Sequence, residues 1–217
     1  MIGTVVVLAK APVAGRVKTR LTPPLTPQAA ANVAAAALAD TLDTISMIPA
    51  QRRVLAFDGD AAPWRPRGWD MIAQPTGGLD VRIAAALADA GNGSVVLVGM
   101  DTPQLRADQL TAFDPEQFGA CLAPSEDGGY WAIGLRDPRD AHAVVSGVPM
   151  STRHTGAMQL MRLRQVGLRV QLLDRLADVD TIGTARHVAA VVPESRFARA
   201  LADVDDGYPV SDARIAG

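Results

Sequence analysis

A cluster of basic side chains near the start of the chain could bind phosphate groups. Residues 9–21 read AKAPVAGRVKTRL, and no acidic residue occurs among residues 1–39 to neutralise these cations. Guanidinium and ammonium groups both bind phosphate oxygens, and a glycine lets backbone N–H groups come close to an anion. We therefore predict a nucleotide- and phosphate-binding loop, with a solvated basic loop as the alternative. Its predicted binding residues are Ala9, Lys10, Gly15, Arg16, Lys18 and Arg20.

The pattern within this loop narrows the classes of protein to which it could belong. Arg16, Lys18 and Arg20 are spaced by two, which in a loop or extended segment puts all three on one side. The segment lacks both the Walker A pattern and the G-x-G-x-x-G pattern. A P-loop kinase or a nicotinamide-dependent enzyme is therefore disfavoured.

A single carboxylate follows an apolar segment that reads as a buried strand. Residues 94–99 are SVVLVG, and Asp101 comes two positions later. Mg²⁺ and Mn²⁺ take few protein ligands in nucleotide sites and keep other positions for phosphate oxygens and water. Asp101 is therefore a candidate metal ligand, and capping of the following turn is the alternative.

A second polar cluster lies between two later segments that read as strands. Residues 125–131 are SEDGGYW, so two carboxylates, two glycines and two aromatic rings occur together. Asp127 could bind a sugar hydroxyl or act as a base, and Gly128 and Gly129 permit close backbone approach to a ligand. A tight turn without a site is the alternative, because Asp-Gly strongly favours hairpin turns.

A third acidic motif precedes a segment that reads as a helix. Residues 178–181 are DVDT. Acidic side chains at a helix start are typical of capping, which is the preferred interpretation of this motif when it is taken alone.

Alternating strands and helices must position these residues. Apolar runs without polar alternation, such as residues 3–9, are typical of strands buried on both faces. Thr26 and Pro27 have the residue types of a helix N-cap and first helical position. Strands are expected near residues 3–9, 53–57, 71–73, 94–99, 118–123, 130–135 and 168–173. Helices are expected near residues 26–48, 79–90, 106–113, 138–146, 154–166, 181–192 and 194–204.

This order predicts an α/β fold with a mostly parallel sheet, flanked by helices. The segments 118–123 and 130–135 are expected to form a small antiparallel portion at the sheet edge. Polar residues that follow parallel strands then meet at the C-terminal edge of the sheet, where open sheets bind ligands.

The composition is typical of a globular protein rather than of a nucleic-acid-binding or membrane protein. Of 217 residues, 48% are hydrophobic, the net charge is −2 and there is one cysteine. Nucleic-acid binders are usually basic, so no nucleic-acid partner is expected. No apolar run approaches a membrane span, and the first nine residues do not resemble a signal peptide. We expect a cytoplasmic protein, and the sequence does not indicate its oligomeric state.

Four segments together resemble a known family. They are residues 9–21 (AKAPVAGRVKTRL), 99–105 (GMDTPQL), 124–135 (PSEDGGYWAIGL) and 178–181 (DVDT). They resemble the bacterial glycosyltransferase-like proteins called radical-SAM/selenodomain-associated transferases, a branch of the nucleotide-diphospho-sugar transferase (GT-A) superfamily. The resemblance implies a single GT-A, Rossmann-like domain over residues 1–204, followed by a frayed tail, residues 205–217.

The resemblance also implies roles for particular residues. Asp101 matches the metal-binding Asp of the superfamily, and similarity to sugar nucleotidyltransferases makes Asp180 a candidate second ligand for Mg²⁺ or Mn²⁺. Gly128, Gly129 and Tyr130 belong to an element that would line the acceptor or sugar side, with Asp127 beside them. The chain departs from the family pattern at residues 77–80 and 150–152, which bears on acceptor or base specificity.

Two chemistries and one non-enzymatic role stay open from the sequence. A glycosyltransferase would move a sugar from a nucleotide-diphospho-sugar to a small acceptor. A nucleotidyltransferase would couple a nucleoside triphosphate to a phosphate-bearing small molecule, with Arg16 and Lys18 stabilising the departing pyrophosphate. The third possibility is a degenerate GT-A domain that only binds its ligand. We place glycosyl transfer first because of the customary family assignment.

Overall fold

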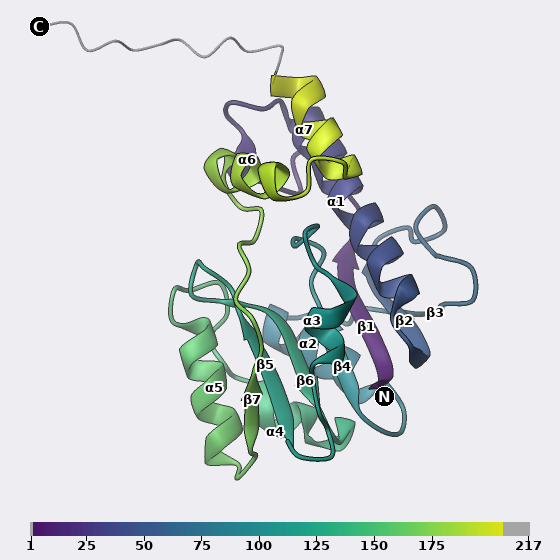
Figure 1. Ribbon diagram of the computed structural model, residues 1–217, viewed down its shortest axis with the longest axis vertical. Coiled ribbons are helices and arrows are strands. Elements are labelled where there is room, and N and C mark those ends of the chain that lie inside the picture. Colours follow the sequence, from purple (N-terminus) through teal and green to yellow (C-terminus); the bar gives the residue numbers. More distant parts are fainter. Residues whose placement is uncertain (1, 206–217) are drawn as a thin grey trace, which may run out of the picture.

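The computed structural model describes residues 2–205, which form helices around one seven-stranded sheet (Figure 1). The strands are β1 (Ile2–Lys10), β2 (Ala50–Asp58), β3 (Asp70–Ala73), β4 (Val95–Val98), β5 (Ala120–Pro124), β6 (Tyr130–Leu135) and β7 (Val170–Leu172). Their order across the sheet is β3-β2-β1-β4-β6-β5-β7. The predicted α/β fold with a mostly parallel sheet is confirmed. The predicted C-terminal tail, apart from Asp205, lies outside the described residues.

The interior strand β1 illustrates why the sheet is mostly parallel. It pairs in parallel with both neighbours, so that Val7 lies beside Leu55 of β2 and Val98 of β4. Parallel neighbours need crossover connections, and helices cover both faces of the sheet as a result. The apolar run in β1 is buried on both sides, as its lack of alternation predicts.

The antiparallel portion is β6, which pairs antiparallel with β4 on one side and β5 on the other. The expected antiparallel pair is therefore present, but it lies inside the sheet. The short strand β7 pairs in parallel with β5 and forms the edge instead. A chain segment far along the sequence thus takes the edge position, which local patterns in residues 118–135 do not reveal.

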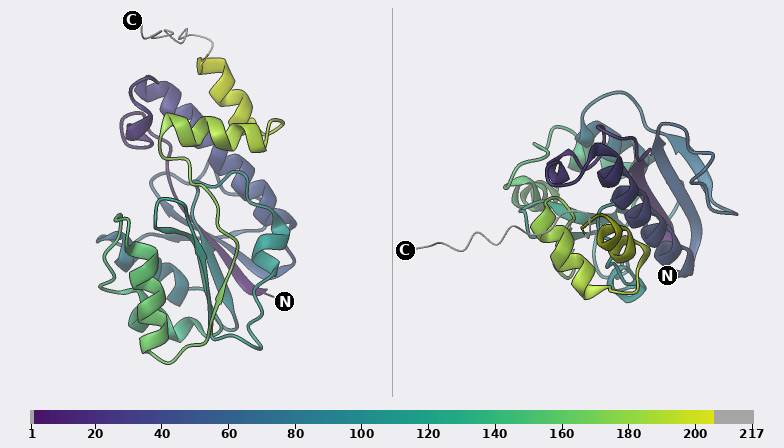
Figure 2. Two further views of the ribbon diagram at one scale, coloured as in Figure 1. Left: turned by 60° about the vertical axis from the view of Figure 1, so that its left-hand side comes forward. Right: turned by 90° about the horizontal axis from the view of Figure 1, so that it is seen from above.

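Helices cover both faces of the sheet (Figure 2). Each layer of helices packs against the sheet around its own apolar core. The helices are α1 (Pro27–Met47), α2 (Leu79–Ala88), α3 (Ala107–Thr111), α4 (Ala141–Val145), α5 (Thr155–Gln165), α6 (Ile182–Val191) and α7 (Arg196–Asp205), with 3-10 turns η1 (Thr19–Leu21) and η2 (Pro138–Asp140). Helices α1 and α3 pack on one face, whereas α2, α4 and α5 pack on the other. Among the described residues, no helix has the length and apolarity to cross a membrane.

Helix α1 begins as its sequence predicts and extends beyond the sheet. The hydroxyl of Thr26 accepts a hydrogen bond of 3.1 Å from the N–H of Ala29, which satisfies one free donor of the first turn. The N-terminal part of α1 packs against α6 and α7 in a third apolar core, above the sheet edge (Figure 1).

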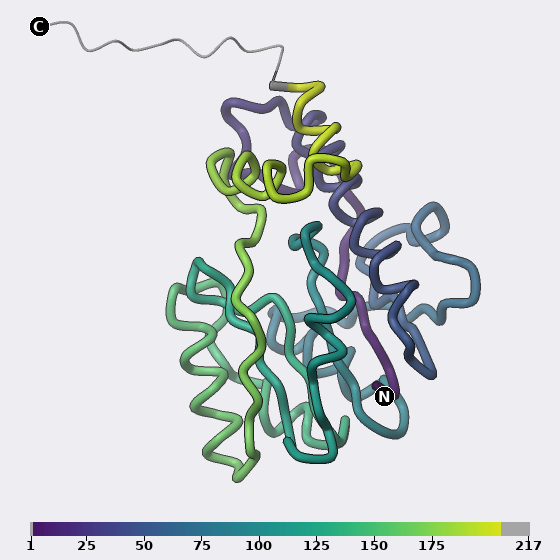
Figure 3. The backbone as a smooth tube through the Cα atoms, viewed as in Figure 1, coloured from purple at the N-terminus to yellow at the C-terminus, as the bar shows by residue number. Residues whose placement is uncertain are grey.

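Hydrogen bonds and ion pairs between α1 and the start of α7 hold this helical layer together. Asp40 of α1 accepts a hydrogen bond of 2.8 Å from the N–H of Phe197, and Arg196 forms ion pairs with Asp40 and Asp43. Figure 3 shows the chain running from β7 past the sheet to α6. This connection brings residues 178–181 beside the loop that follows β1.

Candidate functional site

A cleft of about 730 Å³ opens at the C-terminal edge of the sheet. The parallel strands β1 and β4 end there, and the loop after β1, the β5–β6 turn and the β7–α6 connection surround it. Volumes of this size are typical of small-molecule sites. The cleft contains most of the residues that the sequence singles out: Ala9, Lys10, Lys18, Arg20, Asp101, Asp127, Gly129, Tyr130 and Asp180.

Lys18 is the most constrained cation of the site. Its backbone adopts the left-handed conformation, with φ 46°, just before the 3-10 turn η1. Its ammonium lies 2.7 Å from the Oδ1 atom of Asp101 and also donates to the carbonyl oxygen of Val179. Only 8% of the Lys18 side chain is exposed, whereas 47% of the Asp101 side chain is exposed. A non-glycine residue held in this conformation indicates that its surroundings position it strongly.

Arg20 forms the second ion pair of the site. Its Nη1 atom lies 2.5 Å from the Oδ2 atom of Asp180. This hydrogen bond and the charge of Asp180 raise the pKa of Arg20 above its usual value. The Arg20 side chain is 69% exposed, so the pair is well hydrated and contributes little to stability.

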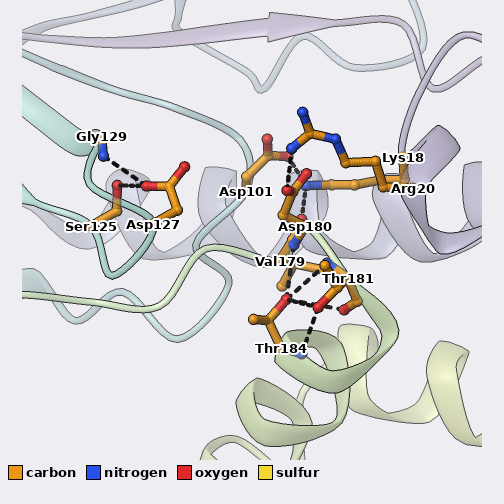
Figure 4. Close-up of polar contacts among 10 residues, drawn as sticks. All are labelled: Lys18, Arg20, Asp101, Ser125, Asp127, Gly129, Val179, Asp180, Thr181 and Thr184. Atoms are coloured by element: carbon orange, nitrogen blue, oxygen red, sulfur yellow. Dashed lines mark hydrogen bonds and ion pairs between the residues drawn. The ribbon is translucent and has the colours of Figure 1, made fainter. Parts of the chain in front are cut away.

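The two carboxylates are brought together by the backbone. The N–H of Val179 donates a hydrogen bond of 3.0 Å to the carbonyl oxygen of Asp101, which ties the β7–α6 connection to the end of β4. We call Lys18, Arg20, Asp101 and Asp180 the ion-paired end of the cleft (Figure 4). The DVDT motif therefore faces the cleft, although Thr181 also caps α6 by accepting a hydrogen bond from the N–H of Thr184.

The carboxylates at the ion-paired end fit a divalent cation whose other coordination positions are filled mainly by phosphate oxygens and water. In the described part of the chain, no group of three or more His, Cys, Asp or Glu side chains is arranged to hold a metal. However, Mg²⁺ needs only one or two carboxylates when phosphate oxygens and water complete its coordination. Asp101 and Asp180 supply two, and the buried hydroxyl of Thr102 has no hydrogen-bond partner within residues 2–205. An unpaired buried hydroxyl beside Asp101 is consistent with a missing polar ligand.

Asp127 lies in a tight turn at the other side of the cleft. Its Oδ1 atom accepts hydrogen bonds of 2.8 Å from the hydroxyl of Ser125 and 2.8 Å from the N–H of Gly129 (Figure 4). These two bonds fix the orientation of the carboxylate. We call Ser125, Asp127, Gly129 and Tyr130 the turn end of the cleft. The Asp-Gly motif thus forms a tight turn, and this turn also lines the cleft, so a turn and a ligand site are compatible there.

Gly128 is required by close backbone contact. Its φ is +91°, and a Cβ atom there would lie 2.1 Å from the carbonyl oxygen of Arg153. The N–H of Gly156 donates a hydrogen bond of 2.8 Å to the carbonyl oxygen of Gly128, so the turn is clamped to the start of α5. Gly128 therefore supports the turn end without being among the cleft-lining residues.

Tyr130 forms a wall of the cleft. Its hydroxyl lies 3.4 Å from the Oε1 atom of Gln159 and 3.8 Å from the sulfur of Met150. Burial, followed by the charge of Asp80, raises the pKa of Tyr130 above its usual value. The phenol therefore stays neutral at physiological pH.

The predicted binding residues of the loop after β1 fall into two sets, those that line the cleft and those that do not. Lys18 and Arg20 face the cleft because the 3-10 turn rotates them toward Asp101 and Asp180. Gly15 and Arg16 lie exposed at the loop tip and do not line the cleft. The carbonyl oxygen of Arg16 accepts a hydrogen bond of 2.9 Å from the ammonium of Lys10, which curls the loop.

The cleft is also lined by residues that the sequence does not assign to the site, among them Asp178, Gln74, Arg82 and Met150. Asp178 faces the cleft, and burial, followed by the charge of Asp127, raises its pKa. Gln74 donates hydrogen bonds to the carbonyl oxygens of Ala9 and Ala56, 2.7 and 2.9 Å away. The DVDT motif could have indicated Asp178, and the departure from the family pattern at residues 150–152 includes Met150, whereas Gln74 and Arg82 depend on tertiary packing.

Comparison with known proteins identifies a family model and several solved structures that are similar to this chain. A family model described as "Uncharacterized protein conserved in bacteria (DUF2064)" matches residues 31–152. None of the curated proteins compared with the chain matches its sequence.

Solved structures share the whole architecture. A candidate nucleotide-diphospho-sugar transferase from Desulfovibrio desulfuricans G20 is 24% identical, with a TM-score of 0.83 over 95% of this chain and 96% of that one. CMP:2-keto-3-deoxy-manno-octonic acid synthetase, solved with CTP, is 12% identical, with a TM-score of 0.58 over 89% and 99%. Rv0371c from Mycobacterium tuberculosis H37Rv, solved with manganese, is 20% identical, with a TM-score of 0.51 over 87% and 98%. These similarities establish the nucleotide-diphospho-sugar transferase-like fold.

Proposed function

The chain belongs to the bacterial family described as DUF2064, and we propose that it is a metal-dependent transferase that moves a sugar from a nucleotide-diphospho-sugar to a small acceptor. The observation that carries this proposal is one cleft with two chemically different ends. The ion-paired end offers cations and carboxylates for a diphosphate, and the turn end offers a fixed carboxylate beside an aromatic wall. Two substrates could therefore meet between them.

The ion-paired end would hold the diphosphate of the donor. Lys18 and Arg20 would bind its oxygens by charge-assisted hydrogen bonds, and they would stabilise the negative charge that develops as the nucleoside diphosphate leaves. Asp101 and Asp180 would hold Mg²⁺ or Mn²⁺. When bound there, such an ion would supply further positive charge next to the leaving group.

The turn end would prepare the acceptor. Asp127 would accept the proton of the attacking hydroxyl, because Ser125 and Gly129 fix one of its oxygens and the carboxylate lines the cleft. Tyr130 would provide a flat surface against which an acceptor or sugar could pack. The bond between the acceptor oxygen and the anomeric carbon would form as the bond to the diphosphate breaks.

A nucleotidyltransferase is the second candidate. The similar fold of a synthetase solved with CTP favours it, and so do the cations at the ion-paired end. In that reaction a phosphate-bearing acceptor would attack the α-phosphate of a nucleoside triphosphate, and pyrophosphate would leave.

The nature of the released phosphate distinguishes the two reactions. The protein would be incubated with Mn²⁺, a panel of nucleotide sugars or nucleoside triphosphates, and a mixture of small acceptors. Phosphorus NMR would identify the product. Glycosyl transfer predicts a free nucleoside diphosphate from one nucleotide sugar, with Asp127→Asn as the inactive control. Pyrophosphate released from a triphosphate only when a phosphorylated acceptor is present would instead identify nucleotidyl transfer.

A further inference from the structure

The ion pairs at the ion-paired end link two groups with different proposed ligands. Lys18 and Arg20 are the side chains that suit phosphate oxygens, and Asp101 and Asp180 are those that suit a metal. In the structure each cation is bound to one of the carboxylates, at 2.7 and 2.5 Å (Figure 4). Each cation that would bind phosphate is thus paired with a carboxylate that would bind the metal.

Burial makes the Lys18 pair the stronger of these two links. The Lys18 side chain is 8% exposed, and its ammonium contacts Asp101 and the carbonyl oxygen of Val179. Leaving a buried charge without its partner costs far more than breaking an exposed ion pair. A metal that takes Asp101 alone would leave Lys18 without its ion-pair partner, with only the more distant charge of Asp178 acting on it, and a phosphate that takes Lys18 alone would face a free carboxylate.

Binding of both ligands together removes both penalties. The carboxylates exchange their cations for the metal, and the cations exchange their carboxylates for phosphate oxygens. We infer that the Lys18–Asp101 ion pair makes the two ligands interdependent: it hinders binding of a divalent metal alone, and a di- or triphosphate that takes the Lys18 ammonium frees Asp101 for the metal. The inference rests on the proposed function, because it assumes that both ligands bind here.

This coupling has a measurable size. If the metal raises the affinity for the diphosphate by some factor, the diphosphate must raise the affinity for the metal by the same factor. Coupling between sites is typically about 5- to 150-fold. A single phosphate offers fewer oxygens to replace both carboxylates, so a nucleoside monophosphate should be coupled to the metal less strongly than a diphosphate.

The test is a thermodynamic cycle of binding measurements. Mn²⁺ binding would be followed by electron paramagnetic resonance with and without a nucleoside diphosphate. The binding of that diphosphate would be measured by calorimetry with and without Mn²⁺. The proteins would be the wild type, Lys18→Met, Lys18→Arg and, as an exposed control cation, Arg20→Gln. Circular dichroism would confirm that each variant is folded.

The wild type should show at least about tenfold coupling in both directions. Lys18→Met should bind Mn²⁺ alone more tightly than the wild type does, and it should lose most of the coupling. Lys18→Arg should keep the coupling, and Arg20→Gln should change it less. If Lys18→Met does not fold, Lys18→Gln takes its place, because the wild-type cycle alone does not assign the coupling to Lys18.

Different failures would have different meanings. Independent binding of Mn²⁺ and diphosphate to the wild type would overturn the coupling while leaving the proposed function intact. Weaker binding of Mn²⁺ alone to Lys18→Met would also overturn it. No binding of either ligand, alone or together, would reject the proposed function as well.

Discussion

The two ends of the cleft are built in different ways. At the ion-paired end, side chains from distant parts of the chain meet, and Arg20 and Asp180 lie 160 positions apart in the sequence. At the turn end, Asp127 is fixed by neighbours two positions away, Ser125 and Gly129. The first end depends on the whole fold and is held by opposite charges. The second end is a local unit, in which Asp127 forms no direct ion pair within residues 2–205, and this suits a group that must accept a proton.

The largest expected effect is on turnover, at the turn end. Replacing the carboxylate in Asp127→Asn removes the proposed base but keeps an oxygen that accepts from Ser125 and Gly129. General-base catalysis contributes about 10²- to 10⁴-fold, so kcat should fall by that factor while donor affinity changes little. Steady-state kinetics and calorimetry on the same protein would check both numbers. An unchanged kcat would remove Asp127 from the reaction.

A metal-ligand substitution at the ion-paired end should chiefly affect binding. In Asp101→Asn the amide oxygen can still accept from Lys18, but the negative charge that attracts a metal is lost. Even changes to residues that only hydrogen-bond to a metal ligand alter metal affinity by about 10- to 100-fold, so the metal-dependent part of nucleotide affinity should fall by at least that much. Calorimetry with and without Mn²⁺ would measure it. A metal-dependent affinity equal to that of the wild type would exclude Asp101 as a ligand.

The cation of the same end should discriminate between phosphates and the nucleoside. Removing the ammonium in Lys18→Ala eliminates charge-assisted hydrogen bonds worth about 1.5–3 kcal/mol each, or about 10- to 100-fold in affinity. Binding of di- and triphosphates should weaken by this factor, whereas binding of the nucleoside should not change. An equal loss for both ligands would show that the loop recognises something other than phosphate.

The turn end should be more sensitive than the ion-paired end to small steric changes. A Cβ atom in Gly128→Ala would collide with the carbonyl oxygen of Arg153, 2.1 Å away, at a φ of +91°. Strain of this kind is expected to cost about 2–4 kcal/mol, which lowers Tm by roughly 5–15 °C. Gly15→Ala is the matched control, because Gly15 also has a positive φ, +76°, but no atom within 4 Å of the added Cβ. Equal losses in differential scanning calorimetry would argue against the clash.

The smallest expected effect is on Tm and concerns a pH-dependent hydrogen bond of Asp80, whose charge also acts on Tyr130 at the turn end. Asp80 accepts a hydrogen bond of 2.9 Å from the N–H of Gly147, which lowers its pKa. A folded pKa below the unfolded value, about 3.9, means that this contribution to stability is present at neutral pH. It is lost as the pH falls through the folded pKa. The difference in Tm between wild type and Asp80→Asn should therefore be present at pH 7 and shrink near pH 3. A constant difference would assign the effect to something other than this carboxylate.

The same contrast explains what the sequence could predict. Residue patterns are sufficient for the alternating strands and helices, the N-cap at Thr26 and the turn at Asp127, because each depends on neighbouring residues. The basic loop and Asp101 could be recognised as separate candidates from their positions after strands. Their direct contact could not, since it depends on β4 pairing beside β1 and on the left-handed backbone of Lys18.

Packing also decides which predicted residues reach the cleft. Arg16 and Lys18 have similar sequence contexts, yet the left-handed backbone of Lys18 and the following 3-10 turn direct only the latter into the cleft. Gln74 lines the cleft because its amide bridges the carbonyl oxygens of β1 and β2. Neither arrangement has a local sequence pattern.

The most direct test of the account is whether Asp101 and a divalent metal are needed together for nucleotide-sugar binding. Differential scanning fluorimetry would compare wild type and Asp101→Asn with a panel of nucleotide sugars, with Mn²⁺ and with a chelator. Ligands that bind only the folded state raise its Tm by mass action. The account predicts that at least one nucleotide sugar raises the wild-type Tm in Mn²⁺, and that either the chelator or Asp101→Asn abolishes this rise. A rise of equal size in all three conditions would contradict the account.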